Sequence, residues 1–237
     1  MINFLALKSP TANLFIIPMK FKMTFKLSPS ALNLMIECPR CFWLDKHNKW
    51  KRPSGNFPSL PHGMDRILKT HFDNIMRQGL LPPELKGNGE TKGLLLFDDE
   101  ELLNKWRSQF KGIQWEDKEG NILHGAVDNI LKKGRKLIVL DYKTRGFALK
   151  EDTHKYYQNQ LDFYNLLLRK NKHDTEDYAF LLFYHPKEVK ETGEVIFNTD
   201  LKKMKVNIKN AEKIWNKAIK LLNRDCPSKC CEWCDGR

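Results

Sequence analysis

Residues 124–146, HGAVDNILKKGRKLIVLDYKTRG, contain the clearest structural pattern in the chain. Two apolar runs, at 130–131 and 137–140, flank the pair Lys133-Gly134. Apolar runs on either side of a short polar segment with a glycine are typical of a β-hairpin. The pattern therefore predicts two antiparallel strands joined by a two-residue loop at Lys133-Gly134.

Acidic and basic side chains fall at matched positions of this predicted hairpin. With that loop, Asp128 lies opposite Val139. Because side chains alternate along a strand, Val139, Asp141 and Lys143 then share a face with Asp128. Two neighbouring carboxylates repel each other unless positive charge lies beside them. A divalent cation with oxygen ligands meets this requirement, and a salt-bridge ladder on a solvated surface is the alternative interpretation.

The order of these residues resembles a known nuclease motif. Asp128 followed by Asp141-Tyr-Lys143 is similar to the PD-(D/E)XK phosphodiesterase motif, and Gln160-Leu-Asp-Phe-Tyr164 is similar to the QxxxY motif of its RecB-like branch. A DxK tripeptide alone is a weak signal, whereas the whole series in this order is a stronger one. The resemblance implies an α/β fold with a restriction-endonuclease-like core, in which a mixed central β-sheet is flanked by helices.

The resemblance also implies a role for each motif residue. Carrying the motif over position by position gives a catalytic set of Asp128, Asp141, Lys143, Gln160 and Tyr164. Both aspartates and the backbone carbonyl of Tyr142 would hold one or two Mg²⁺ or Mn²⁺ ions, which would activate water and offset charge on the phosphate. The lysine would orient the attacking water or stabilise the pentavalent centre. The glutamine would position substrate or water, and the tyrosine would support it by packing.

A second group of candidate metal ligands lies on a helix predicted over residues 63–77. RecB-like nucleases place a metal-binding His on such a helix after a Gly, but His71 is too far from Gly63 for the usual spacing. Either Asp65 or His62 could take its place. A solvated helix with ordinary charges is the alternative.

All six cysteines lie near the two ends of the chain. Two CxxC pairs could supply four thiolates to one metal if the ends meet. Ligation by four thiolates suits Zn²⁺ or an iron–sulfur cluster. Free buried thiols are the alternative interpretation. Disulfides are not expected because no secretion signal is predicted. The arrangement resembles the RecB-like and CRISPR-associated iron–sulfur exonucleases, which implies a staple of Zn²⁺ or a [4Fe–4S] cluster joining the termini. The predicted ligands are Cys38, Cys41, Cys231 and Cys234, with Cys226 and Cys230 as alternates.

The charge of the chain favours a polyanionic partner. Its 237 residues suit one large domain and include 41 Lys and Arg against 29 Asp and Glu, a net charge of +12. Four lysines at intervals of three or four residues share one side of the predicted last helix, and we name them the lysine stripe. This stripe is a candidate phosphate-contacting face, with an ordinary solvated face as the alternative. Its members are Lys209, Lys213, Lys217 and Lys220.

The N-terminal segment, residues 1–22, shows no such organisation. It is fairly apolar, but Lys8 and Pro10 interrupt it, so no run is long enough to span a bilayer. No positively charged start precedes the apolar part, so no secretory signal is expected. We expect a poorly structured extension over 1–22, with Met23 as an alternative start, and a single nuclease domain over 23–237 in a cytoplasmic protein without a membrane partner.

The other expected elements follow from spacing and capping. A helix begins at Ser28-Pro29, where a capping hydroxyl precedes a proline, and continues through Cys38 to Phe42. On the helix over 153–169 one stripe is expected to be buried, formed by Tyr157, Leu161, Tyr164 and Leu168. Further elements are expected as a helix over 98–110 and as strands over 113–115, 178–184, 194–197 and 204–208. The last helix is expected to bury Ala211, Ile214, Trp215, Ala218 and Leu222.

The resemblance, together with the basic charge, implies a metal-dependent deoxyribonuclease. Its expected partner is DNA, single-stranded or with free ends, in DNA repair, recombination or defence. A non-catalytic nucleic-acid-binding module on the same fold is the main alternative, and a zinc-stapled interaction protein is another. The presence of Asp128, Asp141 and Lys143 together argues against a degenerate module, which has no physical reason to keep all three.

Overall fold

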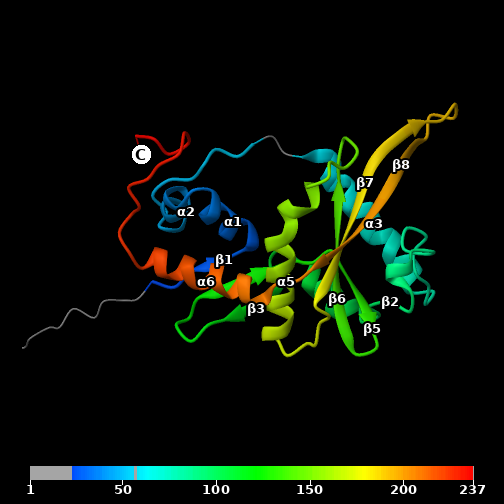
Figure 1. Cartoon of the computed structure of the whole chain (residues 1–237), viewed down its shortest axis with the longest axis horizontal. Coiled ribbons are helices and arrows are strands. Elements are labelled where there is room, and N and C mark those ends of the chain that lie inside the picture. The colour runs from blue at the N-terminus through cyan, green and yellow to red at the C-terminus, as the bar shows by residue number, and fades with distance from the viewer. Residues whose placement is uncertain (1–22, 56–57, 237) are drawn as a thin grey trace, which may run out of the picture.

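A computed structural model of the protein describes residues 23–55 and 58–236. The extension expected over residues 1–22 lies outside them. The described residues form two β-sheets with helices packed around them (Figure 1). This architecture confirms the predicted mixed α/β fold. Among these residues no helix combines the length and apolar character that a membrane span requires.

The larger sheet has the strand order β2-β5-β6-β7-β8, and the smaller sheet has the order β1-β4-β3. The strands are β1 (Lys26–Leu27), β2 (Leu95–Leu96), β3 (Ile113–Glu116), β4 (Ile122–Gly125), β5 (Asn129–Lys133), β6 (Lys136–Thr144), β7 (Tyr178–Val189) and β8 (Val195–Lys205). The helices are α1 (Pro29–Glu37), α2 (Pro39–Lys46), α3 (Ser59–Met76), α4 (Glu100–Arg107), α5 (Gln158–Lys170) and α6 (Ile208–Leu222), with short 3₁₀ segments η1 (Gly89–Thr91) and η2 (Thr153–Tyr157).

The β5–β6 hairpin forms as predicted, but its register differs by two residues. Lys133 pairs with Lys136, so the two loop residues are Gly134 and Arg135 rather than Lys133 and Gly134. The reason is the φ of 59° at the first loop residue, which glycine adopts without strain and lysine does not. A shift of two residues keeps every side chain on its face. The predicted shared face is therefore retained.

The hairpin continues into a parallel strand through a helical crossover. β6 pairs in parallel with β7, and α5 lies in the connection between them. α5 packs against β6 of the larger sheet and against β3 and β4 of the smaller one. Every residue from Leu161 to Leu168 is consequently buried. Leu161, Tyr164 and Leu168 of the expected stripe are therefore buried as predicted, whereas Tyr157 is half-buried in η2. Burial extends beyond the stripe because a helix between two sheets has no solvated face there.

The N-terminal helix is divided in two at Cys38. This residue ends α1 and caps the start of α2 in an extended conformation, with φ −149° and ψ 104°. Pro39 explains the break, because it lacks an N–H and disfavours the helical conformation of the residue before it. The expected single helix through Phe42 was therefore wrong, although Ser28 does cap α1 by accepting from Ala31 N–H at 3.2 Å.

The other elements differ from expectation mainly at their ends. α3 begins at Ser59, four residues before the expected start, and α4 begins after Asp99, which caps it. The two strands expected over 194–197 and 204–208 are one continuous strand, β8, paired along β7. Most residues between them are polar because β8 is an edge strand and most of its side chains face solvent.

Candidate active site and cysteine cluster

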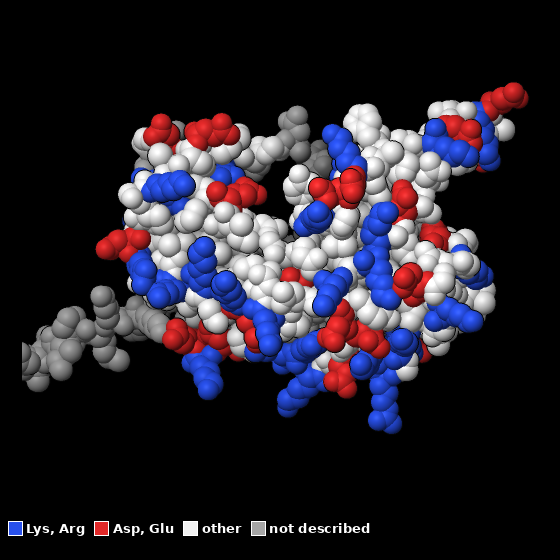
Figure 2. All heavy atoms as spheres, in the orientation of Figure 1, with Lys and Arg blue, Asp and Glu red and all other residues white. Residues whose placement is uncertain are grey.

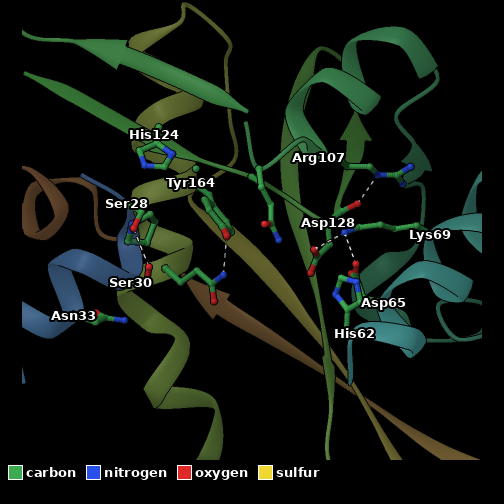
Figure 3. Close-up of a pocket in the computed structure, with 15 residues that line it drawn as sticks. Ser28, Ser30, Asn33, His62, Asp65, Lys69, Arg107, His124, Asp128 and Tyr164 are labelled. Carbon is green, nitrogen blue, oxygen red and sulfur yellow. Dashed lines mark hydrogen bonds and ion pairs between the residues drawn. The ribbon is translucent and has the colours of Figure 1, made fainter. Parts of the chain in front are cut away.

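A cleft of about 650 Å³ opens between two walls of the molecule. α3 and the chain around Asp128 form one wall, and the start of α1, β4 and α5 form the other (Figure 3). The molecular surface is hollowed between the part that contains α1 and α2 and the part that contains β6 and β7 (Figure 2). Of the predicted motif residues, Asp128, Gln160 and Tyr164 line this cleft.

Asp128 and Asp141 approach each other where the β5–β6 hairpin opens. Asp128 Oδ2 accepts a hydrogen bond of 3.0 Å from the backbone N–H of Tyr142. Asp141 is 1% exposed, and its Oδ2 contacts Lys143 Nζ in an ion pair but accepts no well-directed hydrogen bond. The structure thus brings the predicted carboxylates and ammonium of the motif into one group.

Burial controls the ionisation of this group. It raises the pKa of Asp141 to about 7; the charge of Asp128 adds to this rise, and Lys143 opposes it. Burial also acts to lower the pKa of Lys143, but the two carboxylates outweigh it, so that pKa is raised. Two acidic groups therefore share one site with an ammonium that stays charged.

The same group fits a divalent cation. Asp141 Oδ2 is a buried carboxylate oxygen without a hydrogen bond, and its neighbour Asp128 disfavours its charged form. A cation between the carboxylates would satisfy that oxygen and remove the repulsion. The donors are hard oxygens, which Mg²⁺ and Mn²⁺ prefer. The residues present are therefore compatible with the metal that the motif implies.

The wall formed by α3 carries a carboxylate and a lysine that face Asp128. Lys69 Nζ lies 2.8 Å from Asp65 Oδ2 and 3.2 Å from Asp128 Oδ1, and the three side chains point toward one another (Figure 3). His62 also lines the cleft. His71 instead lies 3.0 Å from Glu84. Of the helix candidates, Asp65 and His62 are thus near the carboxylates, and His71 is not among the residues lining the cleft.

Arg107, which the sequence did not single out, fixes the backbone of Asp128. Its Nε donates to the carbonyl oxygen of Asp128 at 2.7 Å, and its Nη1 donates to both carboxylate oxygens of Asp73 at 2.8 Å. The Arg107 side chain is 7% exposed. No local pattern marks this residue, because its partners lie 21 and 34 positions away.

The opposite wall holds the predicted QxxxY pair. Gln160 Nε2 donates to Tyr164 Oη at 2.7 Å, and both residues line the cleft. Burial raises the pKa of Tyr164 and Asp141 adds to it, so the phenol stays protonated. Gly125 packs against this ring, since a Cβ there would lie 2.9 Å from Tyr164 Cε1. His124 also lines the cleft; burial lowers its pKa, and Lys26 and Lys46 add to that effect.

The two CxxC pairs meet although almost the whole chain separates them. The four sulfur atoms of Cys38, Cys41, Cys231 and Cys234 lie within 4.8 Å of one another. All are free thiols in the structure. Cys226 Sγ instead accepts a hydrogen bond of 3.5 Å from Arg40 Nη1, and Cys230 is exposed beside Asp235. The structure therefore groups the four predicted ligands and leaves both alternates outside the group.

The lysine stripe lies on α6, apart from the cleft. All four side chains are exposed, and none of them lines the cleft. Figure 2 shows Lys and Arg side chains over α6 and along the lower edge of the view, with Asp and Glu among them. Contact between the stripe and phosphate stays a prediction.

Comparison with known proteins agrees with this geometry at the level of the superfamily. A family model described as the PD-(D/E)XK nuclease superfamily matches residues 55–237. The chain therefore belongs to the PD-(D/E)XK nuclease superfamily. A solved structure titled "Crystal structure of SSO0001" is similar over 88% of this chain and 81% of its own, with 13% sequence identity and a TM-score of 0.41. No curated protein sequence matches the chain significantly.

Proposed function

We propose that this protein is a divalent-metal-dependent deoxyribonuclease and that Asp128, Asp141 and Lys143 form its reaction centre. The observation that carries the proposal is the buried Asp141 carboxylate beside Asp128, with Lys143 in ion-pair contact, at the edge of a cleft. Charged groups are rarely buried together without a functional reason, because their desolvation is expensive. Membership of a nuclease superfamily supports the same reaction class.

Each group at the reaction centre would have a separate role in metal binding or catalysis. Asp128, Asp141 and the Tyr142 carbonyl would hold Mg²⁺ or Mn²⁺, with Asp65 as a further candidate ligand. The bound ion would supply Lewis-acid stabilisation of the phosphate. Lys143, kept charged by Asp141, would donate from Nζ to the attacking water or to a phosphate oxygen.

The QxxxY pair would orient the water or the substrate from the other wall. Gln160 lines the cleft and uses its Nε2 to donate to Tyr164 Oη, so its Oε1 would be the atom that accepts from water or substrate. An acceptor at this place can hold a water proton and so aim the water oxygen at phosphorus. Tyr164 is buried and fixes the amide.

We propose DNA, single-stranded or with free ends, as the substrate, in repair, recombination or defence. The net charge of +12 supports a polyanion, and the lysine stripe would contact phosphates outside the cleft. A single nuclease domain over residues 23–237 and membership of the RecB-like branch, with its CRISPR-associated exonucleases, are parts of this proposal. The QxxxY pair and the cysteine cluster support that branch.

The four grouped cysteines would hold a metal centre, either Zn²⁺ or an iron–sulfur cluster, as a structural staple. Cys38 and Cys41 lie at the α1–α2 junction, and Cys231 and Cys234 follow α6. Because closure entropy grows only slowly with loop length, one metal can hold such distant segments together. The binding energy of the metal then contributes to folding.

Cleavage assays with matched variants test the reaction centre. Labelled single-stranded and double-stranded DNA would be incubated with Mg²⁺, Mn²⁺ or chelator, using the wild type, Asp141→Asn and Lys143→Ala. Both variants should lose metal-dependent cleavage and still bind DNA, whereas Lys150→Ala, in an exposed loop, should cleave normally. Binding without cleavage by the wild type would indicate a non-catalytic module. Undiminished cleavage by both site variants would refute the assignment.

A further inference from the structure

The spacing of the four sulfur atoms distinguishes between the two kinds of metal centre. The Cys38–Cys234 and Cys231–Cys234 sulfur distances are both 3.8 Å, and the Cys41–Cys231 distance is 3.5 Å. No pair among the four is more than 4.8 Å apart. The cluster is therefore compact in every direction rather than divided into two separated pairs.

These distances match four ligands of one ion. A tetrahedral zinc site has Zn–S bonds of about 2.3 Å, so its ligand sulfurs lie about 3.8 Å from one another. In a [4Fe–4S] cluster each of the four cysteines binds a different iron atom, and in a [2Fe–2S] cluster they bind two irons in pairs. Bridging sulfide then holds the cysteine sulfurs on different irons much farther apart than 4.8 Å. The observed sulfur spacing matches ligands of one ion and is shorter than the spacing of sulfurs on different irons.

We propose that the four-cysteine cluster holds one zinc ion in a closed structural site. This inference rests on the proposed metal staple and is independent of nuclease activity. Among single ions, zinc is favoured over divalent iron because sites of a given ligand set bind Zn²⁺ more tightly than Fe²⁺. Four protein ligands complete the tetrahedron and leave no position for water, as in structural rather than catalytic zinc sites.

Hydrogen-bond donors beside the sulfurs would favour charged thiolate ligands. The backbone N–H of Cys41 donates to Cys38 Sγ at 3.5 Å, and that of Cys231 donates to Cys234 Sγ at 3.4 Å. Arg52 Nη2 donates to Cys231 Sγ at 3.6 Å, while its Nη1 pairs with Glu37 at 2.9 Å. Four thiolates and one zinc ion carry a charge of −2, which the guanidinium partly offsets. Hydrogen bonds of this kind orient and stabilise metal ligands.

The site would tie three separate segments together. Cys38 and Cys41 come from the α1–α2 junction, the second pair follows α6, and Arg52 precedes α3. α1 forms part of one cleft wall and α3 forms the other. Loss of the ion should therefore loosen the cleft as well as the chain ends.

Metal analysis of the full chain tests the inference directly. Protein would be purified anaerobically from cells supplied with both iron and zinc, and its zinc, iron and sulfide would be measured. We expect one zinc per chain, no sulfide and no visible absorption. Exchange of zinc for Co²⁺ should then give the visible absorption bands of a tetrahedral thiolate site. Iron with sulfide, or a single iron without sulfide, would overturn the zinc assignment but keep the four-cysteine site. A metal-free protein would overturn both.

Cysteine-to-serine variants distinguish the metal ligands from the other cysteines. Cys38→Ser and Cys234→Ser should each lose the zinc and melt at a similarly lowered temperature. Cys226→Ser is the matched control, because Cys226 lies outside the group, and it should retain one zinc. If a ligand variant does not fold, the metal content of the wild type and of Cys226→Ser still decides the question. Loss of zinc from Cys226→Ser would show that the ligand set is wrong.

Discussion

Replacement of Asp73 by alanine should destabilise the protein through Arg107. The two residues form a bidentate ion pair with both N–O distances at 2.8 Å, and their side chains are 15% and 7% exposed, respectively. Asp73→Ala leaves the guanidinium buried without its carboxylate. Arg107 Nη2 already lacks a hydrogen-bond partner, so the variant would remove the carboxylate from Nη1 as well.

The expected effect follows from the burial of the pair. Breaking a buried pair by removing one partner destabilises by about 3–5 kcal/mol, and the lower value applies because Asp73 is partly exposed. For a protein of this length about 1 kcal/mol shifts the melting temperature by roughly 2–4 °C, so a loss of about 6–12 °C is expected. Arg107 also holds the Asp128 carbonyl at 2.7 Å. Mn²⁺ affinity should therefore fall, by about 10–100-fold as for other residues that orient metal ligands.

Thermal unfolding followed by circular dichroism measures the first effect, and calorimetric titration with Mn²⁺ measures the second. Glu100→Ala is the matched control, because it removes the partner of Arg77 in an exposed pair with side chains 52% and 38% exposed. Such surface pairs contribute about 0.2–1 kcal/mol. If both variants melt at the same temperature, the buried pair does not stabilise the fold in the way argued above.

Three further changes test the cleft and the basic surface. Gly125→Ala should push the Tyr164 ring away and lower both the cleavage rate and the melting temperature. Gly146→Ala is the control and should behave as wild type, because a Cβ at Gly146 would have no atom within 4 Å. Equal behaviour of the two variants would contradict the close packing at Gly125. Lys69→Met removes an ammonium that competes with a metal ion for Asp128, so calorimetry without DNA should show tighter Mn²⁺ binding. Weaker or unchanged Mn²⁺ binding would contradict this prediction. Replacing the lysine stripe with Gln should flatten the slope of log affinity against log salt, by about 0.9 for each lysine that contacts phosphate in duplex DNA; an unchanged slope means that the stripe is only solvated.

The meeting of Asp128 and Asp141 was predictable because it depends on local periodicity. The predicted loop was wrong by two residues, yet a two-residue shift leaves the alternation of faces unchanged. A one-residue error would have separated the carboxylates. The face on which each side chain of a hairpin lies is thus easier to predict than the residue opposite it. The pairing of opposite residues depends on which loop residue accepts a positive φ.

The rest of the site depends on contacts between segments distant in the sequence. Lys69 and Arg107 reach Asp128 from two different helices, and no spacing within either helix indicates this. Burial of α5 on all sides likewise follows from its position between two sheets. The break at Cys38 is different, because Pro39 marks it in the sequence and the helical spacing of apolar residues obscured that signal.

Asp128 belongs to neither sheet, since β4 ends at Gly125 and β5 begins at Asn129. Tyr142 N–H and Arg107 hold Asp128 directly, and the chain that leads into Asp128 leaves the smaller sheet only three residues earlier. The position of the smaller sheet relative to the larger one therefore also affects the distance between Asp128 and Asp141. α5 contacts both and acts as a spacer, and Leu167 presses against Gly125 at the end of β4. Mg²⁺ requires oxygens at about 2.0–2.1 Å and Ca²⁺ at about 2.3–2.6 Å. In the proposed metal site, the thickness of this apolar layer would influence which ion radius the carboxylates accept. Metal selectivity would then respond to core substitutions that touch no ligand.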